Sequence, residues 1–387
     1  MFTGIVVVGT VPALDRESMS KQQDRSELNR PLRSGRRGLV VCTSIVARLG
    51  VFIFFTVTIL LAAEVVTRWF DGGGLPSVRI FAQNGEGVIE LMEQAEAWHR
   101  RPRGDVYPVF TGALGLRAAK PNEPSPAPGG WIAVGDSQVF GLGVRAEETF
   151  AARATAKGVP MANAGVPGYG VEDALRRAAA LIPRVEPRGI LVIVNQANDW
   201  EEMGEPVQQR FRVRGGWLLR AGDAAAWEGA FMETRLSQLH LFFHAAQLLH
   251  VATHGPRVPA PAAWIDSPQS YEPVTRKMAR AIELFAATYP QLSVVLCFLP
   301  VDFATGRERA RQSPFRDMVA HRIPWEDHEL RDQLMRSLSA SPKIDLLPAL
   351  RDRPDAFLED DYHLSPTGHA VVADQIVNTL TARQRGP

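Results

Sequence analysis

Ser137, Asp360 and His363 are the residues whose types and settings could together perform nucleophilic catalysis. Ser137 ends the tripeptide Gly-Asp-Ser, which directly follows the apolar run "WIAV", and Asp360 precedes His363 by three residues in "DDYHLSPTGH". A serine hydroxyl is a weak nucleophile until a base takes its proton and a third group orients that base. One short loop that carries Asp360 and His363 could supply both groups, so the sequence predicts a serine-centred acyl-transfer site.

Each of these residues also has a plain structural interpretation. Ser137 alone would fit an N-cap or a turn, and His363 alone would fit an exposed loop. Asp361 could take the place of Asp360. His369 falls in the predicted helix that follows, where we expect it to cap or pack rather than react.

Two further segments could supply hydrogen-bond donors for an oxyanion. Gly168 in "NAGVPGYG" would let a backbone N–H approach closely, and Asn198 in "NQANDW" carries a side-chain amide. Both segments follow apolar runs that resemble buried strands. In a doubly wound sheet the carboxyl ends of the strands lie along one edge, so we expect these donors to meet Ser137 there.

The elements that would position these residues alternate between strands and helices. Four apolar runs predict strands at "WIAV", "VPMANAG", "GILVIVNQ" and "LSVVLCFLP", and helical patterns begin near Glu147, Val171, Val274 and Pro366. This alternation predicts an α/β fold with a parallel, doubly wound sheet.

The segments around Ser137, Gly168, Asn198 and His363, in this order, resemble the four sequence blocks of the SGNH/GDSL hydrolase family, in its membrane-anchored GDSxxxGxGV form. The resemblance spans about residues 130–384 and implies a flavodoxin-like sheet. It also implies Ser137 as nucleophile, His363 as general base and then acid, and Asp360 as the group that orients His363, because the family's spacing favours Asp360 over Asp361.

The resemblance further implies an oxyanion hole. Its donors would be the backbone N–H groups of Ser137 and Gly168 and the side chain of Asn198, with Gly165 a weaker alternative to Gly168. The sequence departs from the family pattern at Gln196, where the third block usually has glycine, and this side chain could narrow the pocket.

Residues 201–265 interrupt the alternation and are interpreted as an insertion over the site. "QRFRVRGGWLLRAG" predicts a β-hairpin, and "TRLSQLHLFFHAAQLLHVATH" predicts an amphipathic helix. His240 and His244 have the i, i+4 spacing of metal ligands, but no carboxylate in this stretch completes a site, so a half-buried helix face is the favoured interpretation. The hairpin arginines could bind an anionic polymer or headgroup, or simply be solvated.

Residues 38–63 form an apolar run with one charge, Arg48, long enough to cross a bilayer core of roughly 30 Å. Arginines precede the run, which places the amino terminus in the cytoplasm and the rest outside, in the periplasm or extracellular space. A buried soluble helix and a cleaved signal peptide are the alternatives, and Met19 is a possible start. We predict a tail at 1–37, an anchor at 38–64, a spacer with a helical stretch at 88–99 within 65–128, and a hydrolase domain at 129–384.

Composition excludes few functions. Forty-three Lys and Arg against 42 Asp and Glu give a net charge of +1, so no global field attracts nucleic acid. Cys42 and Cys297 are not expected to pair, and we predict neither a metal nor an organic cofactor. The oligomeric state is left open.

The function that fits best is an extracytoplasmic esterase acting through an acyl-enzyme on acetyl or another small acyl group of a cell-surface glycan. An O-acyltransferase of exopolysaccharide modification shares the same chemistry and differs only in its acceptor. A phospholipase or lipase, which the anchor would hold beside its lipid, and a non-catalytic carbohydrate-binding protein are the further alternatives.

Overall fold

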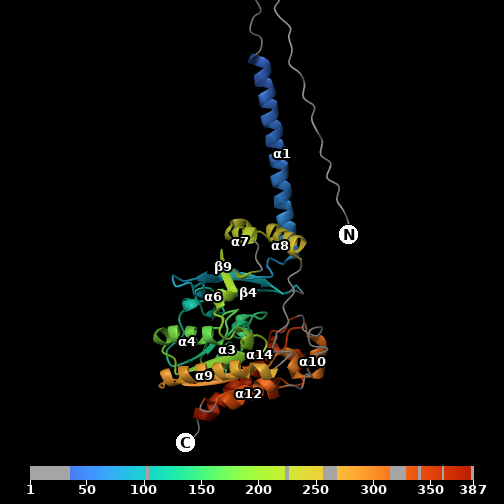
Figure 1. Ribbon diagram of the computed structural model, residues 1–387. Helices are drawn as coiled ribbons and strands as arrows, with labels where there is room; N and C mark the ends of the chain where they lie inside the picture. Colours follow the sequence, from blue (N-terminus) through green and yellow to red (C-terminus); the bar gives the residue numbers. More distant parts are fainter. Residues whose placement is uncertain are drawn as a thin grey trace, which may run out of the picture. The chain divides into compact units, whose positions relative to one another are not determined.

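A computed structural model describes residues 35–101, 104–222, 226–255, 268–313, 328–338, 341–359 and 361–384. The chain divides into two units, Met1–Leu60 and Leu61–Pro387, of which the second holds all the strands. Helix α1, Gly35–Phe70, crosses the boundary between them (Figure 1). Its stretch Ile45–Phe70 is long and apolar enough to span a membrane, and none of its most apolar part is buried against protein.

The central sheet has five strands, all parallel, in the order β12-β11-β8-β6-β7. Their bounds are β6 Trp131–Val134, β7 Met161–Asn163, β8 Gly189–Asn195, β11 Ser293–Leu299 and β12 Lys343–Asp345. Numbered along the chain this order is 2-1-3-4-5, the flavodoxin-like arrangement. The predicted fold class is therefore confirmed, with β12 as a short fifth strand that the sequence pattern did not indicate.

Helices cover both faces of this sheet because successive side chains of a strand point to opposite sides. Ile132, Val134 and their neighbours face the layer of α4 Val171–Val185, α9 Glu272–Thr288 and α12 Glu329–Ser337. Trp131 and Ala133 face the layer of α3 Phe150–Ala156 and α14 Pro366–Gln384. Every residue of β6 and of β8 is consequently buried.

The segment expected to be a spacer contributes two small antiparallel sheets to the second unit. One pairs β1 Phe81–Gln83 with β2 Ile89–Leu91, and the other joins β3 Glu96–Arg100, β4 Val106–Thr111 and β5 Arg117–Ala118. The helix predicted at 88–99 is wrong: Ile89 and Leu91 are buried while Glu90 between them is not, which is the two-residue period of a strand.

The predicted hairpin is confirmed. Strands β9 Phe211–Arg214 and β10 Trp217–Arg220 pair in antiparallel register across Gly215 and Gly216. The turn binds β1, since Gly216 O accepts from Phe81 N at 3.0 Å. Helix α7 Ala226–Glu233, the turn η3 Arg235–Gln238 and helix α8 His240–His254 follow (Figure 1).

Short elements complete the described chain. The short helices are α2 Ser137–Phe140, α5 Asp199–Glu202, α6 Val207–Arg210, α10 Arg307–Gln312 and α13 Leu347–Leu350. The single 3-10 turns are η1 Ala113–Gly115, η2 Ala146–Glu148, η5 Pro268–Tyr271, η6 Asp302–Thr305 and η7 Pro354–Ala356.

Candidate active site

Ser137 is the first residue of α2, directly after the tight turn that ends β6. The turn requires glycine at 135, because its φ is +155° and a Cβ there would stand 2.6 Å from Val139 Cγ2. Asp136 caps the helix: its Oδ1 accepts from Gln138 N at 2.9 Å and its Oδ2 accepts from Asn195 Nδ2 at 2.7 Å. Strands β6 and β8 are neighbours at the point where strand order reverses, and sites of open α/β sheets form at this point.

The structure brings His363 to Ser137, although 226 residues separate them along the chain. His363 Nε2 lies 2.8 Å from Ser137 Oγ. His363 is 5% exposed and Ser137 9% exposed, so little water screens this contact. The Tyr362 ring stacks on the imidazole with centroids 4.4 Å apart.

Asp361 is the carboxylate that the structure places on the other side of the imidazole. Its Oδ2 lies 2.8 Å from His363 Nδ1, and its Oδ1 accepts from Tyr362 N at 2.7 Å. Asp360, the first choice of the sequence analysis, lies outside the described residues. The structure thus offers Asp361 as a carboxylate that can orient His363, because the bond to Tyr362 N turns it back toward the histidine. The assignment of Asp360 stays a prediction.

The charges of this pair shift both pKa values toward the ionised forms. Burial would raise the pKa of Asp361, but the adjacent His363 outweighs it and lowers that pKa. Burial would lower the pKa of His363, but the Asp361 carboxylate outweighs it and raises that pKa above its ordinary value of 6.5. The arrangement thus favours an imidazole that readily takes a proton from Ser137.

The Gln138 side chain fixes the loop that carries His363. Its Nε2 donates to Tyr362 O at 3.1 Å, and its Oε1 accepts from Leu364 N at 3.0 Å. The residue next to Ser137 therefore holds the backbone on both sides of the histidine. Nothing in the local sequence signals this contact, which joins segments 224 residues apart.

Gly168 and Asn198, the predicted donors, are both bound by one ion pair whose side chains are 12% and 15% exposed. Asn198 Nδ2 donates to Glu202 Oε2 at 2.8 Å, and Arg210 donates through one nitrogen to Glu202 Oε1 at 2.6 Å and through another to Gly168 O at 2.7 Å. Burial is the main reason that the pKa of Glu202 rises, to about 8, despite Arg210. Sequence reasoning did not identify this pair.

The hairpin strands β9 and β10 lie against Gly168, one of the two predicted donors. Gly168 has φ +88°, and a Cβ on it would stand 3.1 Å from Phe211 Cε2 and 3.4 Å from Leu218 Cδ2. Two hairpin arginines are engaged within the chain, Arg210 as above and Arg214 with Glu233 at 2.9 Å.

Gln196, the departure from the family pattern, is part of the framework. Its backbone N–H donates to Leu299 O at 2.9 Å, and its Oε1 accepts from Val301 N at 3.2 Å. Its side chain is buried and ties β8 to the end of β11. This contact explains why an amide is tolerated where the pattern has glycine.

The remaining histidines of interest have structural partners. His369 is fully buried, stacks on Phe150 and accepts from Phe150 N at 3.2 Å, and burial lowers its pKa to about 3. His240 Nδ1 and His244 Nε2 lie 2.6 and 2.8 Å from Asp71 Oδ2. Within the described residues no group of three or more such ligands could hold a metal ion.

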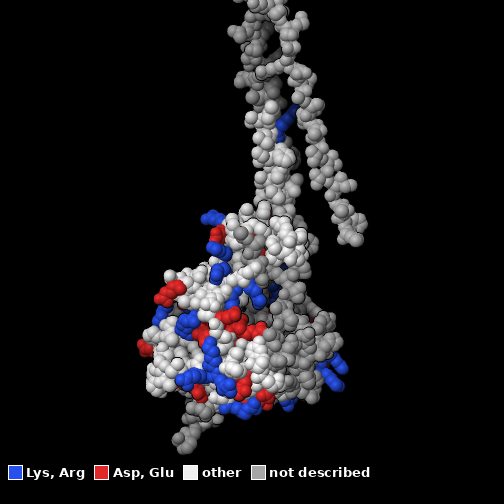
Figure 2. Space-filling view, viewed as in Figure 1, with Lys and Arg blue, Asp and Glu red and all other residues white. Residues whose placement is uncertain are grey.

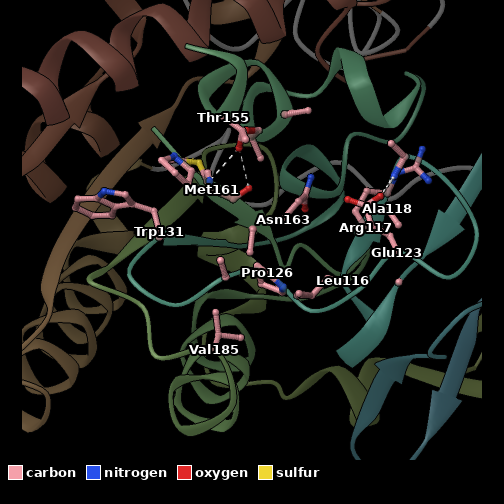
Figure 3. A pocket seen from close by; sticks show the side chains of 18 of the residues that line it. Leu116, Arg117, Ala118, Glu123, Pro126, Trp131, Thr155, Met161, Asn163 and Val185 are labelled. Atoms are coloured by element: carbon pink, nitrogen blue, oxygen red, sulfur yellow. Dashed lines mark hydrogen bonds between the residues drawn. The ribbon is translucent and has the colours of Figure 1, made fainter. Parts of the chain in front are cut away.

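A separate cavity of about 450 Å³ lies beside the edge strand β7 (Figure 3). Figure 3 shows Met161 and Thr155 bonded on one side and Glu123 beside Ala118 on another. Ser137, Asp361 and His363 are not among the residues that line it. We therefore place the site at the opposite, carboxyl end of β6.

The fold and this geometry define a flavodoxin-like α/β chain in which a buried serine, a buried histidine and a partly exposed carboxylate are joined by hydrogen bonds. No family model matches the sequence, and no curated protein matches it.

Solved structures resemble the chain at low similarity. A lipolytic protein assigned to the G-D-S-L family from Desulfitobacterium hafniense shares 12% identity, with 64% of this chain and 97% of that chain covered and a TM-score of 0.30. A lipase/acylhydrolase from Enterococcus faecalis shares 16% identity, with 66% and 96% covered and a TM-score of 0.36. An acetyl-xylooligosaccharide esterase variant from a Geobacillus shares 14% identity, with 65% and 94% covered and a TM-score of 0.32.

Proposed function

We propose that this chain is a serine esterase of the SGNH/GDSL type, which cleaves an acyl ester through a covalent acyl-enzyme. The observation that carries the proposal is the relay at the end of β6, in which Asp361, His363 and Ser137 are joined by two contacts of 2.8 Å. The assignment rests on this geometry and on the sequence blocks, and the low similarity to solved structures adds nothing to it.

Each group has a defined role in this mechanism. His363 Nε2 takes the proton of Ser137 as Oγ attacks the ester carbonyl, and Asp361 stabilises the imidazolium that forms. The same imidazolium then protonates the leaving alcohol, and water attacks the acyl-enzyme with His363 again as base. The overall reaction converts ester and water into acid and alcohol.

The oxyanion would be stabilised by three donors, Ser137 N–H, Gly168 N–H and Asn198 Nδ2. Ser137 is the first residue of α2, so its N–H has no partner within that helix. Arg210 and Glu202 hold the other two donors, which supports a preorganised hole.

We further propose that the substrate carries a small acyl group, such as acetyl, on a cell-surface glycan. The rings and methyl groups of Phe211 and Leu218 crowd the space beside Gly168, which favours a short acyl chain. Helix α1 would anchor the chain in the membrane with the Leu61–Pro387 unit outside the cytoplasm, as the preceding arginines suggest.

The test is a comparison of full-length wild type, Ser137→Ala and the control Ser293→Ala, in which an exposed serine at the start of β11 is removed. Release of p-nitrophenol from acetyl to long-chain esters should fall by roughly 10⁶-fold in Ser137→Ala alone. A fluorophosphonate should phosphonylate Ser137, with fluoride as the leaving group, so the protein gains the reagent's mass less that of HF. Full turnover in Ser137→Ala would refute the proposed nucleophile, and preference for long chains would refute the small acyl group.

A further inference from the structure

Helix α8 presents an apolar face that no described part of the chain covers. Leu241, Ala245, Leu248 and Ala252 recur at helical spacing, and Leu249 lies beside them. Leu241 is half-buried and the other four are exposed. The helix contains no Asp, Glu, Lys or Arg from His240 to His254. An exposed helix face with this composition is unusual for a surface in water.

Exposed apolar side chains concentrate in this part of the molecule. Outside α1, the large exposed apolar side chains of the described residues are Trp98, Leu236, Leu248, Leu249, Val251 and Leu284. Four of these six belong to α8 or to the turn η3 before it. Figure 2 shows the corresponding surface over α8 free of charged side chains. Contiguous patches of this kind mark binding surfaces for protein or membrane.

Two carboxylates hold α8 to the last turns of α1. Glu64 accepts from the N–H groups of His240 and Leu241 at 3.0 and 2.9 Å, so its charge also meets the positive end of the helix dipole. Asp71 accepts from His240 and His244 on the next turn of α8. Helix α8 therefore begins beside Glu64, which is the first charged residue after Arg48 in α1.

The opposite face of α8 packs on the hairpin. The Phe243 ring lies 5.5 Å from that of Trp217, between centroids, and both side chains are buried. Trp217 begins β10, which also carries Leu218 against Gly168. One face of α8 is thus bound to the hairpin that lies beside Gly168, while its other face is left open.

We propose that the open face of α8 lies in the membrane–water interface, where it seats the Leu61–Pro387 unit on the lipid surface. This inference rests on the proposed membrane anchoring by α1. The lipid is favoured over a protein partner because α8 starts where the candidate membrane span loses its uncharged character, and because Trp69 and Phe70, the last two residues of that span, are themselves 75% and 68% exposed. The hairpin beside Gly168 would then be held at a fixed height above the bilayer.

Spin labels in the full-length protein, reconstituted in phosphatidylcholine and phosphatidylglycerol vesicles, test this directly. Single cysteines replace Leu248, Phe54 or Leu284 in a Cys42→Ser background, and the same background without an added cysteine checks that buried Cys297 stays unlabelled. Leu284 is the matched control, a leucine that is 64% exposed on α9. Frequent collisions of the spin label with oxygen indicate that it lies in lipid, and frequent collisions with a water-soluble nickel chelate indicate that it lies in water.

Docking on lipid predicts that the label at Leu248→Cys meets oxygen and loses its access to nickel, while the label at Leu284→Cys keeps that access. Equal nickel access at both positions would overturn the inference. Loss of access to both reagents at Leu248→Cys would show a protein occupant, such as a second copy, and would also overturn it. The Phe54→Cys label tests the proposed membrane anchor separately from the docking of α8. If this label collides with the nickel chelate, α1 does not span the membrane, and the proposed docking of α8 is overturned with it.

Discussion

Gln138 binds the main chain on both sides of His363, at Tyr362 O and at Leu364 N. The nucleophile and the base are thus held by adjacent residues, Ser137 through its hydroxyl and Gln138 through its amide. Since Gln138 follows Ser137 directly on α2, any movement of the helix moves both contacts together. The distance from Ser137 Oγ to His363 Nε2 depends on this amide.

Gln138→Ala is therefore expected to lower kcat by about 10²-fold, the cost of a displacement of about 1 Å at a reacting pair. KM should change little, because Gln138 acts as a positioning residue through the histidine loop. Steady-state kinetics with p-nitrophenyl acetate measure both constants. Gln138→Glu provides the control, since it keeps the acceptor for Leu364 N but cannot donate to Tyr362 O, and an intermediate loss is expected. Unchanged kcat in Gln138→Ala would contradict the role.

Asp361→Asn and Asp360→Asn decide which carboxylate orients His363. Removing the charge from the orienting aspartate of such a triad costs about 10⁴-fold in kcat, because the imidazole then adopts the wrong tautomer and loses its counter-charge. We expect this loss in Asp361→Asn and a rate near that of wild type in Asp360→Asn. The opposite order of the two rates would return the role to Asp360.

Much of this site could be predicted because its residues follow strands. Apolar runs locate β6, β7 and β8, and the rule that strand ends share one edge predicts that Ser137, Gly168 and Asn198 lie near one another without any contact information. His363 could be predicted from the sequence because it lies in the loop just before the last predicted helix. The choice between the two adjacent aspartates cannot be made from sequence spacing alone, because it depends on the backbone dihedrals of a short loop.

The rest of the structure depends on contacts that carry no local signal. Strands β1, β2 and β12 have three residues each and β5 has two, which is too short for a period to identify a strand from the sequence alone. Arg210 is 42 residues from Gly168 in the sequence, and Gln138 belongs to no pattern. The carboxylate that binds His240 and His244 comes from Asp71, far outside the segment in which it was sought.

The activity should depend on pH through His363. Its folded pKa is raised above 6.5 by Asp361, and only the neutral imidazole can act as base. We expect kcat/KM to fall as pH falls through this raised pKa, so the midpoint of the acid limb should lie above 6.5. In Asp361→Asn burial acts without the opposing charge, and the midpoint should move down. Rate profiles between about pH 5 and pH 9 with a neutral ester measure both midpoints, and an unmoved midpoint in the variant would refute the coupling.

We expect the ion pair of Arg210 and Glu202 to affect kcat, because it holds two of the proposed oxyanion donors in place. Arg210→Met removes the donor to Gly168 O and leaves Glu202, whose side chain is only 15% exposed, without its cation, so Gly168 and Asn198 both lose their support. Since loss of one oxyanion donor costs about 10²- to 10³-fold in kcat, a partial misplacement of two donors should cost about 10²-fold with KM largely kept.

Arg214→Met is the matched control for that variant. Arg214 lies on the same hairpin and pairs with Glu233, but both side chains are half exposed, 51% and 53%, so the pair contributes little to stability. Thermal unfolding of both variants separates hairpin stability from catalysis. If Arg210→Met lowers kcat no more than Arg214→Met does, the pair of Arg210 and Glu202 has no part in holding the donors. Asn198→Ala alone is expected to lower kcat by roughly 10²-fold or more, the cost of one lost donor. If Arg210→Met causes no further loss when it is added to Asn198→Ala, the pair acts through Asn198 and not through Gly168.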